Sequence, residues 1–323
     1  MALLRLGTRG SELALFQART VAALLERHSG ASCEIVVIKT SGDRLAEATL
    51  SQIGGKRLFV KEIEDALLAG DIDLAVHSSK DMPAVLPDRL EVGAVLPRED
   101  ARDALVLPES AADFLSLDDI VRALGRAPRI GTSSVRRSAQ LTRLFPGASF
   151  LAIRGNLDTR LRKLDSGQYD ALVLAAAGLR RLGRAGRIST ALPADACVPA
   201  PGQGIIAVEV RSADEGVRRS VAQIDDRGAA VALRAERAVV MRLGGGCQMP
   251  IGAFADVTGD TVTLTGIVIS VDGARAARAT ATGAAANAEA IGVNVAEQLL
   301  ERGADEILAD VQRAQAAVEG IQP

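Results

Sequence analysis

Basic and hydroxyl side chains follow several short hydrophobic runs in the first two-thirds of this 323-residue chain. They are Arg9, Ser11, Ser78, Lys80, Thr132, Ser133, Ser134, Arg136, Arg137, Arg154 and Arg160. An arginine guanidinium is a rigid fork of N–H donors that matches a carboxylate or phosphate. A single such arginine is more often a solvated or capping residue than a ligand-binding one. Their recurrence after one run after another nevertheless predicts a site for a ligand with many anionic groups.

Asp81 stands in the turn that is richest in such residues, His77-Ser78-Ser79-Lys80-Asp81. A carboxylate at this place can cap a helix or pair with Lys80. It can equally stabilise a cation that forms on a bound substrate, because a negative charge lowers the energy of a positive charge beside it. The residue type alone leaves both interpretations open.

Cys247 lies in a loop directly after three glycines, Gly244-Gly245-Gly246. Glycine backbones permit the close approach of a bulky group to the thiol. Spacing alone leaves Cys247 open between a functional and a structural thiol. Cys33 and Cys197 have no such setting, and we expect each to be a small buried hydrophobe.

The cysteine and histidine content argues against a metal centre. The three cysteines are far apart and His28 and His77 are the only histidines, so neither a zinc site nor a disulfide framework is encoded. A Cys–His protease also has no support, because no histidine neighbours Cys247. The chain has neither GxxxxGK[ST] nor GxGxxG, which leaves a nucleotide site unsupported. A net charge of −2, with six Phe, one Tyr and no Trp, disfavours general nucleic-acid binding.

Hydrophobic residues make up 48% of the chain and charged residues 24%, which suits hydrophobic cores under a polar surface. No apolar run approaches the roughly 18 residues that a membrane span needs. Arg5 and Arg9 interrupt the segment where a signal peptide would be apolar. These features predict a globular, cytoplasmic protein without a membrane partner.

Short aliphatic runs alternate with helical patterns over the first two-thirds, which predicts an α/β fold. Strands are expected at residues 3–6, 33–38, 72–76, 129–130, 149–153, 171–174 and 205–210. The helix after residue 11 has an apolar stripe that includes Leu13, Phe16, Val21 and Leu25. In open α/β sheets ligands bind beyond the carboxyl ends of the strands. The polar turns should therefore converge on one cleft.

Two interruptions of the pattern, at residues 97–108 and 193–204, suggest that the chain leaves its first domain and later returns to it. We expect domain 1 at residues 1–103, completed by the returning segment 205–225, and domain 2 at residues 104–204. Residues 45–58 have weak periodicity and are expected to form a loop.

A third domain of α+β type is expected at residues 226–323, where the pattern changes. Its strands are predicted near 252–257, 262–269 and 275–281, and its helices near 286–301 and 304–318. This domain carries the loop of Cys247.

Eight segments carry a resemblance to a known family. They are LGTRGSELALFQ (6–17), KTSGD (39–43), IGGKRLFVKEIEDALL (53–68), DLAVHSSKDMP (73–83), GTSSVRR (131–137), RGNLDTRL (154–161), PGQG (201–204) and GGGCQMPIG (244–252). With them the chain resembles the porphobilinogen deaminase, or hydroxymethylbilane synthase, family over nearly its whole length. The resemblance implies two α/β domains like type II periplasmic binding proteins and a smaller C-terminal α+β domain with a cofactor-bearing loop.

The resemblance also implies an activity in tetrapyrrole biosynthesis (haem, chlorophyll and corrin). Such a transferase deaminates four porphobilinogen molecules and joins them head to tail on a dipyrromethane cofactor, here held by a thioether on Cys247. Hydrolysis then releases the linear tetrapyrrole hydroxymethylbilane. Porphobilinogen is the implied partner, and a monomer without metal or nucleotide is expected.

The resemblance assigns roles to individual residues. Asp81 becomes the catalytic carboxylate. The residues implied to bind cofactor or substrate carboxylates are Arg9, Ser11, Lys56, Lys61, Ser78, Lys80, Thr132, Ser133, Ser134, Arg136, Arg137, Arg154, Arg160 and Gln203. Each pyrrole brings an acetate and a propionate, which fits arginines on many turns. Two positions depart from the family pattern: Arg57 replaces a small residue, and Met249 replaces a frequent valine.

Two other functions remain to be distinguished. One is a two-domain binding protein that captures a carboxylated metabolite unchanged, although simple capture gives the glycine-flanked thiol no purpose. The other is an acyl transferase that uses Cys247 as its nucleophile.

Overall fold

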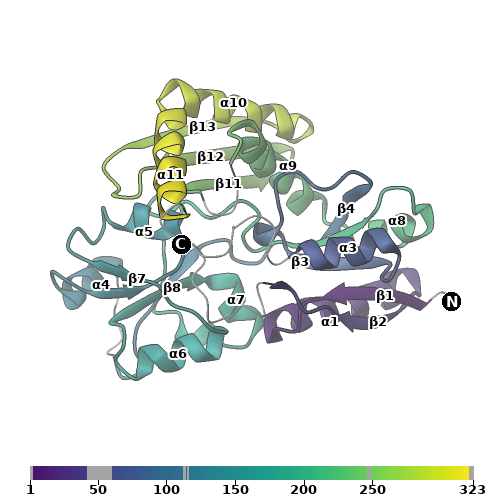
Figure 1. Cartoon of the computed structure of the whole chain (residues 1–323), viewed down its shortest axis with the longest axis horizontal. Helices are drawn as coiled ribbons and strands as arrows, with labels where there is room; N and C mark the ends of the chain where they lie inside the picture. The colour runs from purple at the N-terminus through teal and green to yellow at the C-terminus, as the bar shows by residue number, and fades with distance from the viewer. Residues whose placement is uncertain (1–2, 42–59, 112–113, 115, 246–248, 320–323) are drawn as a thin grey trace.

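The computed structural model describes residues 3–41, 60–111, 114, 116–245 and 249–319. These residues form three units, each with its own sheet (Figure 1). The expected fold class, two α/β domains and a smaller C-terminal α+β domain, is confirmed. The expected loop at 45–58, with Lys56 and Arg57, and Cys247 lie outside the described residues.

The N-terminal unit has a five-stranded sheet in the order β2-β1-β3-β10-β4. Its strands are β1 (Leu3–Thr8), β2 (Ser32–Val37), β3 (Leu74–Ser78), β4 (Leu90–Val95) and β10 (Ile206–Arg211). The helices α1 (Glu12–Ser29), α3 (Lys61–Ala69) and α8 (Glu215–Val221) and the short 3₁₀ turn η2 (Ser79–Asp81) complete it. β1 is parallel to β2 and β3, whereas β10 is antiparallel to β3 and β4.

The core of this unit lies on both faces of the sheet. On one face Val21 and Leu25 of α1 pack with Leu6 of β1. On the other, Ile63 and Leu67 of α3 pack near the start of β3. Both faces are covered because the strands are apolar on both sides.

The middle unit repeats this plan with the strand order β7-β6-β8-β5-β9. Its strands are β5 (Asp103–Val106), β6 (Arg129–Gly131), β7 (Ser149–Leu151), β8 (Ala171–Ala175) and β9 (Thr190–Ala191). Its helices are α4 (Leu117–Leu124), α5 (Val135–Leu141), α6 (Leu157–Asp165) and α7 (Ala176–Arg181). β5 is antiparallel to β8 and β9, as β10 is to its neighbours in the first sheet.

Two segments connect these units. We call residues 96–102 the first crossing and residues 192–205 the second crossing. The first crossing leads from β4 into β5, and the second leads back from β9 into β10. Each crossing therefore delivers an antiparallel strand to the sheet that it enters.

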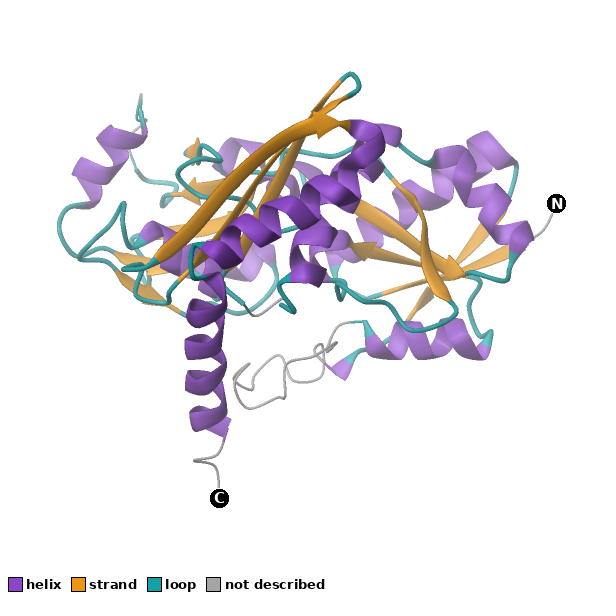
Figure 2. Cartoon of the chain, turned by 90° about the horizontal axis from the view of Figure 1, so that it is seen from above, coloured by secondary structure: helices purple, strands orange, loops and turns teal. Residues whose placement is uncertain are grey.

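The C-terminal unit has an antiparallel sheet of β11 (Ile251–Thr258), β12 (Thr261–Ile269) and β13 (Ala276–Ala284). The helices α9 (Arg227–Arg242) and α10 (Ala288–Glu301) pack against its apolar face. The last helix, α11 (Ala304–Glu319), ends near the C mark and projects from the rest of the chain (Figure 2). No described helix is long and apolar enough to cross a membrane.

Candidate functional site

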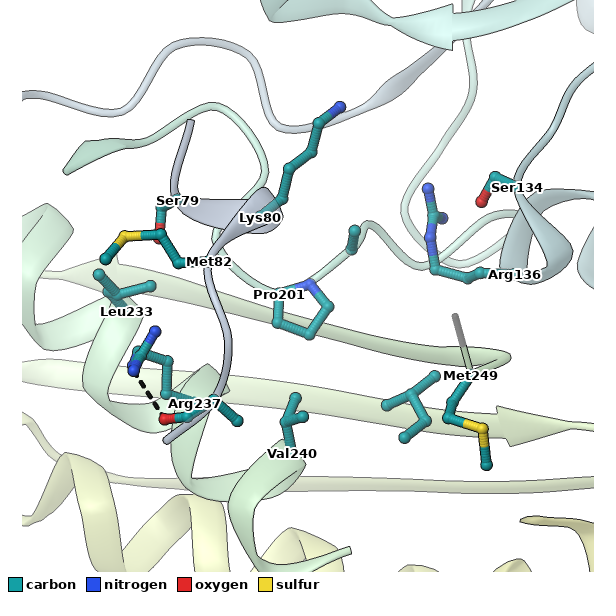
Figure 3. Close-up of a pocket in the computed structure, with 13 residues that line it drawn as sticks. Ser79, Lys80, Met82, Ser134, Arg136, Pro201, Leu233, Arg237, Val240 and Met249 are labelled. Atoms are coloured by element: carbon teal, nitrogen blue, oxygen red, sulfur yellow. Dashed lines mark hydrogen bonds between the residues drawn. The ribbon is translucent and has the colours of Figure 1, made fainter. Parts of the chain in front are cut away.

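The turn η2 separates two neighbouring pockets. The larger one has about 620 Å³ of empty space, part of it open to solvent, and all three units contribute to its wall. Lys80 comes from η2, Ser134 and Arg136 from the N-cap and first turn of α5, and Leu233 and Val240 from α9. Figure 3 shows the polar ends of Lys80 and Arg136 pointing the same way, away from the apolar side chains. The pocket thus has a cationic side and a mainly apolar side, on which Arg237 Nη2 donates to the Ala84 carbonyl at 2.6 Å.

The smaller pocket, of about 410 Å³, lies on the other side of the turn and is bordered by Asp81. Arg9 and Ser11, from the turn between β1 and α1, line it with Gln17, His77 and Ser78. The carboxylate of Asp81 is exposed, and it makes no hydrogen bond or ion pair with the rest of the described chain. Its negative charge is therefore available to a ligand.

Lys80 carries a charge that depends on its surroundings, because its pKa is lowered to about 8. Burial of the ammonium group is the main cause, and the positive charge of Arg137 adds to it. The carboxylates of Asp81 and Asp103 act in the opposite direction. A bound anion would raise the pKa of Lys80 again, because it favours the charged form.

Asp103, which the sequence analysis treated only as part of a domain junction, organises the cationic side. It is the first residue of β5 and its side chain is fully buried. Arg136 Nη1 donates to Oδ2 at 2.7 Å, and Arg137 Nε donates to Oδ1 at 2.8 Å. Burial alone would raise the pKa of Asp103, but the two guanidinium charges outweigh it and hold that pKa far below its usual value.

Gln203 and Cys197, both from the second crossing, complete the contacts of Asp103. Gln203 Nε2 donates to Oδ1 at 2.9 Å, and the Cys197 thiol donates to Oδ2 at 3.3 Å. Burial raises the pKa of Cys197 to about 12, with the charge of Asp103 adding to the effect, so this thiol stays protonated. Three residues that the sequence assigned to ligand carboxylates, Arg136, Arg137 and Gln203, thus meet on a carboxylate of the protein itself.

The remaining residues of the middle unit lie around this cluster. Burial lowers the pKa of the Arg160 guanidinium, and the positive charges of Arg137 and Arg154 add to that effect, whereas Asp81 opposes it. Arg160 therefore lies within electrostatic reach of Asp81. Ser133 Oγ donates to the Ile153 carbonyl at 2.8 Å, a bond that ties the turn after β6 to the end of β7.

The other predicted residues have local partners or different positions. Thr132 Oγ1 accepts a hydrogen bond from the backbone N–H of Ser134. Ser11 Oγ caps α1 by accepting from the Ala14 N–H at 3.3 Å. Lys61 pairs with Asp65 on the exposed face of α3 at 2.8 Å and borders neither pocket.

Gln17 is a second residue that the sequence analysis missed. It is 2% exposed, and its Nε2 donates to Ser78 Oγ at 2.9 Å, so it ties α1 to the end of β3 inside the smaller pocket. The available signal was its position: Gln17 is four residues after Leu13 and four before Val21, within the apolar stripe. A polar residue on a buried helix face needs a partner.

Two family models match this chain. One, described as "Porphobilinogen deaminase, dipyromethane cofactor binding domain", matches residues 4–219, and the other, "Porphobilinogen deaminase, C-terminal domain", matches residues 230–301. The chain is 46% identical over 317 residues to a porphobilinogen deaminase of Geobacter metallireducens, covering 98% of this chain and 97% of the relative. It is 48% identical over 307 residues to the enzyme of that name from Syntrophotalea carbinolica, covering 95% of each.

Solved structures with a similar backbone include substrate-binding domains. The second substrate binding domain of a putative amino acid ABC transporter from Streptococcus pneumoniae is 14% identical, with a TM-score of 0.44, covering 76% of this chain and 95% of that one. The periplasmic VFT2 domain of Bordetella pertussis BvgS is 18% identical, with a TM-score of 0.40, covering 69% of this chain and 86% of that one.

Proposed function

This chain belongs to the porphobilinogen deaminase family, and from that premise we propose the reaction that it catalyses. As a transferase, it deaminates four porphobilinogen molecules and condenses them head to tail on a dipyrromethane primer tethered through a thioether to Cys247. Hydrolysis then releases hydroxymethylbilane. The family acts in tetrapyrrole biosynthesis, and residues 4–219 are its dipyrromethane-cofactor-binding domain.

The observation that carries the proposal is the two-sided character of the larger pocket. Its apolar wall, with Leu233, Val240 and Met249, suits the faces of pyrrole rings, while Lys80 and Arg136 suit their carboxylates. Ser79 Oγ, also in this wall, is buried without a hydrogen-bond partner in the described chain. This oxygen is closed to solvent and lies against Gly202, so the fit of the pocket to the cofactor rests on its two cations and its apolar side chains. The residues present therefore fit the cofactor.

When bound, the dipyrromethane supplies the pyrrole carbon to which the first substrate is joined. The chain's own residues bind and orient the acid side groups: Lys80 and Arg136 at the larger pocket, Arg9 and Ser11 at the smaller one. Positioned reactants react as if intramolecular, which removes much of the entropic barrier. The roles of Thr132, Ser133, Ser134, Arg137, Arg154, Arg160, Gln203, Lys56 and Lys61 remain proposals of the same kind.

Asp81 is proposed to stabilise a positive charge that forms on the substrate. Loss of ammonia leaves a positive charge on the substrate's pyrrole, and a carboxylate beside that ring stabilises it. Asp81 suits this task because it borders the smaller pocket and no described residue neutralises it by direct contact. A cytoplasmic location, a monomeric state and the absence of nucleic-acid or membrane partners remain predictions from the sequence.

The intact mass of the purified protein tests the proposal. We expect the protein to exceed its sequence mass by two pyrrole units and to consume porphobilinogen with release of ammonia. Cys247→Ser should abolish both the excess mass and the turnover, because it removes the only proposed attachment atom. Cys33→Ser, at a half-buried thiol on β2, is the matched control and should keep both.

Two results would contradict the proposal. An active protein whose mass equals its sequence mass would exclude the tethered primer. A protein that binds porphobilinogen and returns it unchanged would instead be the two-domain binding protein considered above.

A further inference from the structure

We propose that Asp103 is a positioning residue, which holds Arg136 and Arg137 in the orientation that receives the acid side groups of the pyrrole chain. The inference rests on the function proposed above. It concerns a residue that does not itself touch the ligand, since the Asp103 side chain is fully buried.

The contacts of Asp103 leave one arginine both anchored and available. Arg136 uses Nη1 for Asp103 Oδ2 at 2.7 Å and for the Val198 carbonyl at 2.6 Å. Its Nε and Nη2 make no hydrogen bond to the described chain, and neither atom is sealed from solvent. Because Arg136 also lines the larger pocket, its anchored atom fixes the direction in which the other donors meet a ligand.

Arg137 is held more completely. Its Nε donates to Asp103 Oδ1 at 2.8 Å and its Nη1 donates to the Val173 carbonyl at 3.0 Å. Its side chain is 10% exposed. Its positive charge nevertheless reaches both Lys80 and Arg160, whose pKa values it lowers. Asp103 thus keeps in place a charge that acts on two other cations of the site.

The local structure of α5 cannot orient these arginines by itself. This helix has only seven residues, and Ser134 at its N-cap makes no side-chain capping bond. Asp103 follows the first crossing directly, at the start of β5, and Gln203 belongs to the second crossing, so the carboxylate ties α5 to the connections between the units. Rigid support of this kind is what a precise binding geometry requires.

The structure allows a sharp distinction between two roles of Asp103. If its charge merely offset the arginines, neutralising it would leave the site more positive and would tighten the binding of anions. If it positions them, neutralising it would release the guanidiniums and weaken that binding in spite of the added positive charge. The two roles therefore predict changes of opposite sign.

Asp103→Asn tests this because it keeps the shape and removes the charge. We expect a lower fraction of cofactor-loaded protein by intact mass, and in the loaded fraction a KM for porphobilinogen raised about tenfold, with kcat changed less. Asp100→Asn is the matched control. Asp100 lies in the first crossing and also pairs with two arginines, Arg102 and Arg180. It borders neither pocket, so loading and KM should stay as in the wild type.

Each other outcome is decisive. Unchanged loading and KM in Asp103→Asn, or a lower KM, would overturn the positioning role while a loaded, active wild type leaves the proposed function standing. A wild type with neither extra mass nor turnover would overturn the proposed function itself. If Asp103→Asn does not fold, a crystal structure of the loaded wild type decides. Both guanidiniums should remain on Asp103 beside the bound carboxylates, and their departure from it would refute the inference.

Discussion

Two aspartates of this site carry opposite assignments because their surroundings differ. Asp103 is buried and accepts from two guanidiniums, an amide and a thiol. Asp81 is exposed and has no hydrogen-bond or ion-pair partner among the described residues. Protein donors surround the charge of Asp103, whereas the charge of Asp81 is available to a substrate cation. Two carboxylates of one site can take different roles because their surroundings differ, although the residue type is the same.

The role of Asp81 leads to a prediction about turnover. Asp81→Asn should lower kcat by roughly 10²–10³-fold, the usual scale for removing one charge-stabilising group from a transition state. Stability should stay unchanged, because the side chain is exposed and bonded to nothing described. Steady-state rates and thermal melting of the variant measure the two effects. Asp88→Asn, at an exposed aspartate of the same unit, is the control, and a wild-type rate in Asp81→Asn would remove Asp81 from the mechanism.

The lowered pKa of Lys80 leads to a prediction about pH. A lysine with a pKa of about 8 loses its positive charge well below the pH at which a solvated lysine does. Above pH 8 the neutral amine attracts a carboxylate less, so kcat/KM for porphobilinogen should fall as pH rises. Lys80→Arg should remove this alkaline fall from the profile, because a guanidinium stays charged. Identical alkaline limbs in the two proteins would show that Lys80 does not control binding.

At the scale of elements, the residue pattern located most strands to within two residues, and the differences have tertiary causes. The strand expected at 72–76 is β3 at Leu74–Ser78. It reaches into the polar turn because His77 and Ser78 pair with Ala207 and Ile206 of the antiparallel strand β10. The partner strand, 130 residues away, could not be read from the local pattern. The strands β4, β5 and β9 and the helices α4, α7 and α8 were not anticipated.

The apolar stripe of α1 contains both correct and incorrect predictions of burial. Val21 and Leu25 are fully buried, as their spacing predicts, but Phe16 is 38% exposed. Gln17 occupies the neighbouring buried position and bonds to Ser78. The first turn of α1 borders the smaller pocket, and the helix enters the core only from Ala18 onward.

The docking of α9 onto the two crossings depends on one buried carboxylate, Glu236. It pairs with Arg98 of the first crossing at 2.5 Å and accepts from the Gly202 N–H of the second crossing at 2.6 Å. The Ala255 N–H of β11 donates to its other oxygen at 2.8 Å. The guanidinium of Arg98 also lies 4.9 Å from the ring centre of Phe254. This cluster joins the C-terminal unit to both crossings between the other two units.

Glu236→Gln should therefore destabilise the protein. It leaves the Arg98 charge buried without a counter-charge, which costs roughly 3 kcal/mol of unfolding free energy. Denaturant titration followed by circular dichroism measures the change. The control is Glu297→Gln, which breaks an exposed pair with Arg242 and should change stability by less than about 1 kcal/mol. Equal midpoints for the two variants would mean that the buried cluster adds nothing to the docking of α9.

At the scale of the whole molecule, no single unit contains the proposed site. The N-terminal unit supplies Lys80 and Asp81, the middle unit supplies Arg136, and the C-terminal unit supplies Leu233, Val240 and Met249 of the apolar wall. The two crossings pass between these parts. Gln203 and Gly202 of the second crossing bind the carboxylates of Asp103 and Glu236. A change in the angle between the units would therefore alter the pocket without altering any unit internally.

The sequence by itself determined the family, the α/β and α+β class, and the turns from which the polar residues come. It could do so because strands, helices and their end residues depend on local spacing, and the motifs are local as well. Met249, where valine is frequent in the family, stands in the apolar wall of the larger pocket. Lys56 and Cys247 lie outside the described residues, so their roles stay predictions from the resemblance.

Only the tertiary structure decided which of these residues share a partner. Arg136 lies 33 positions from Asp103 and Gln203 lies 100 positions away, yet all three meet in one buried cluster because both crossings pass there. It also decided that Lys61 borders neither pocket and that Lys80 has a lowered pKa. Burial and charge proximity are properties of the folded surroundings, and no local pattern of residues encodes them.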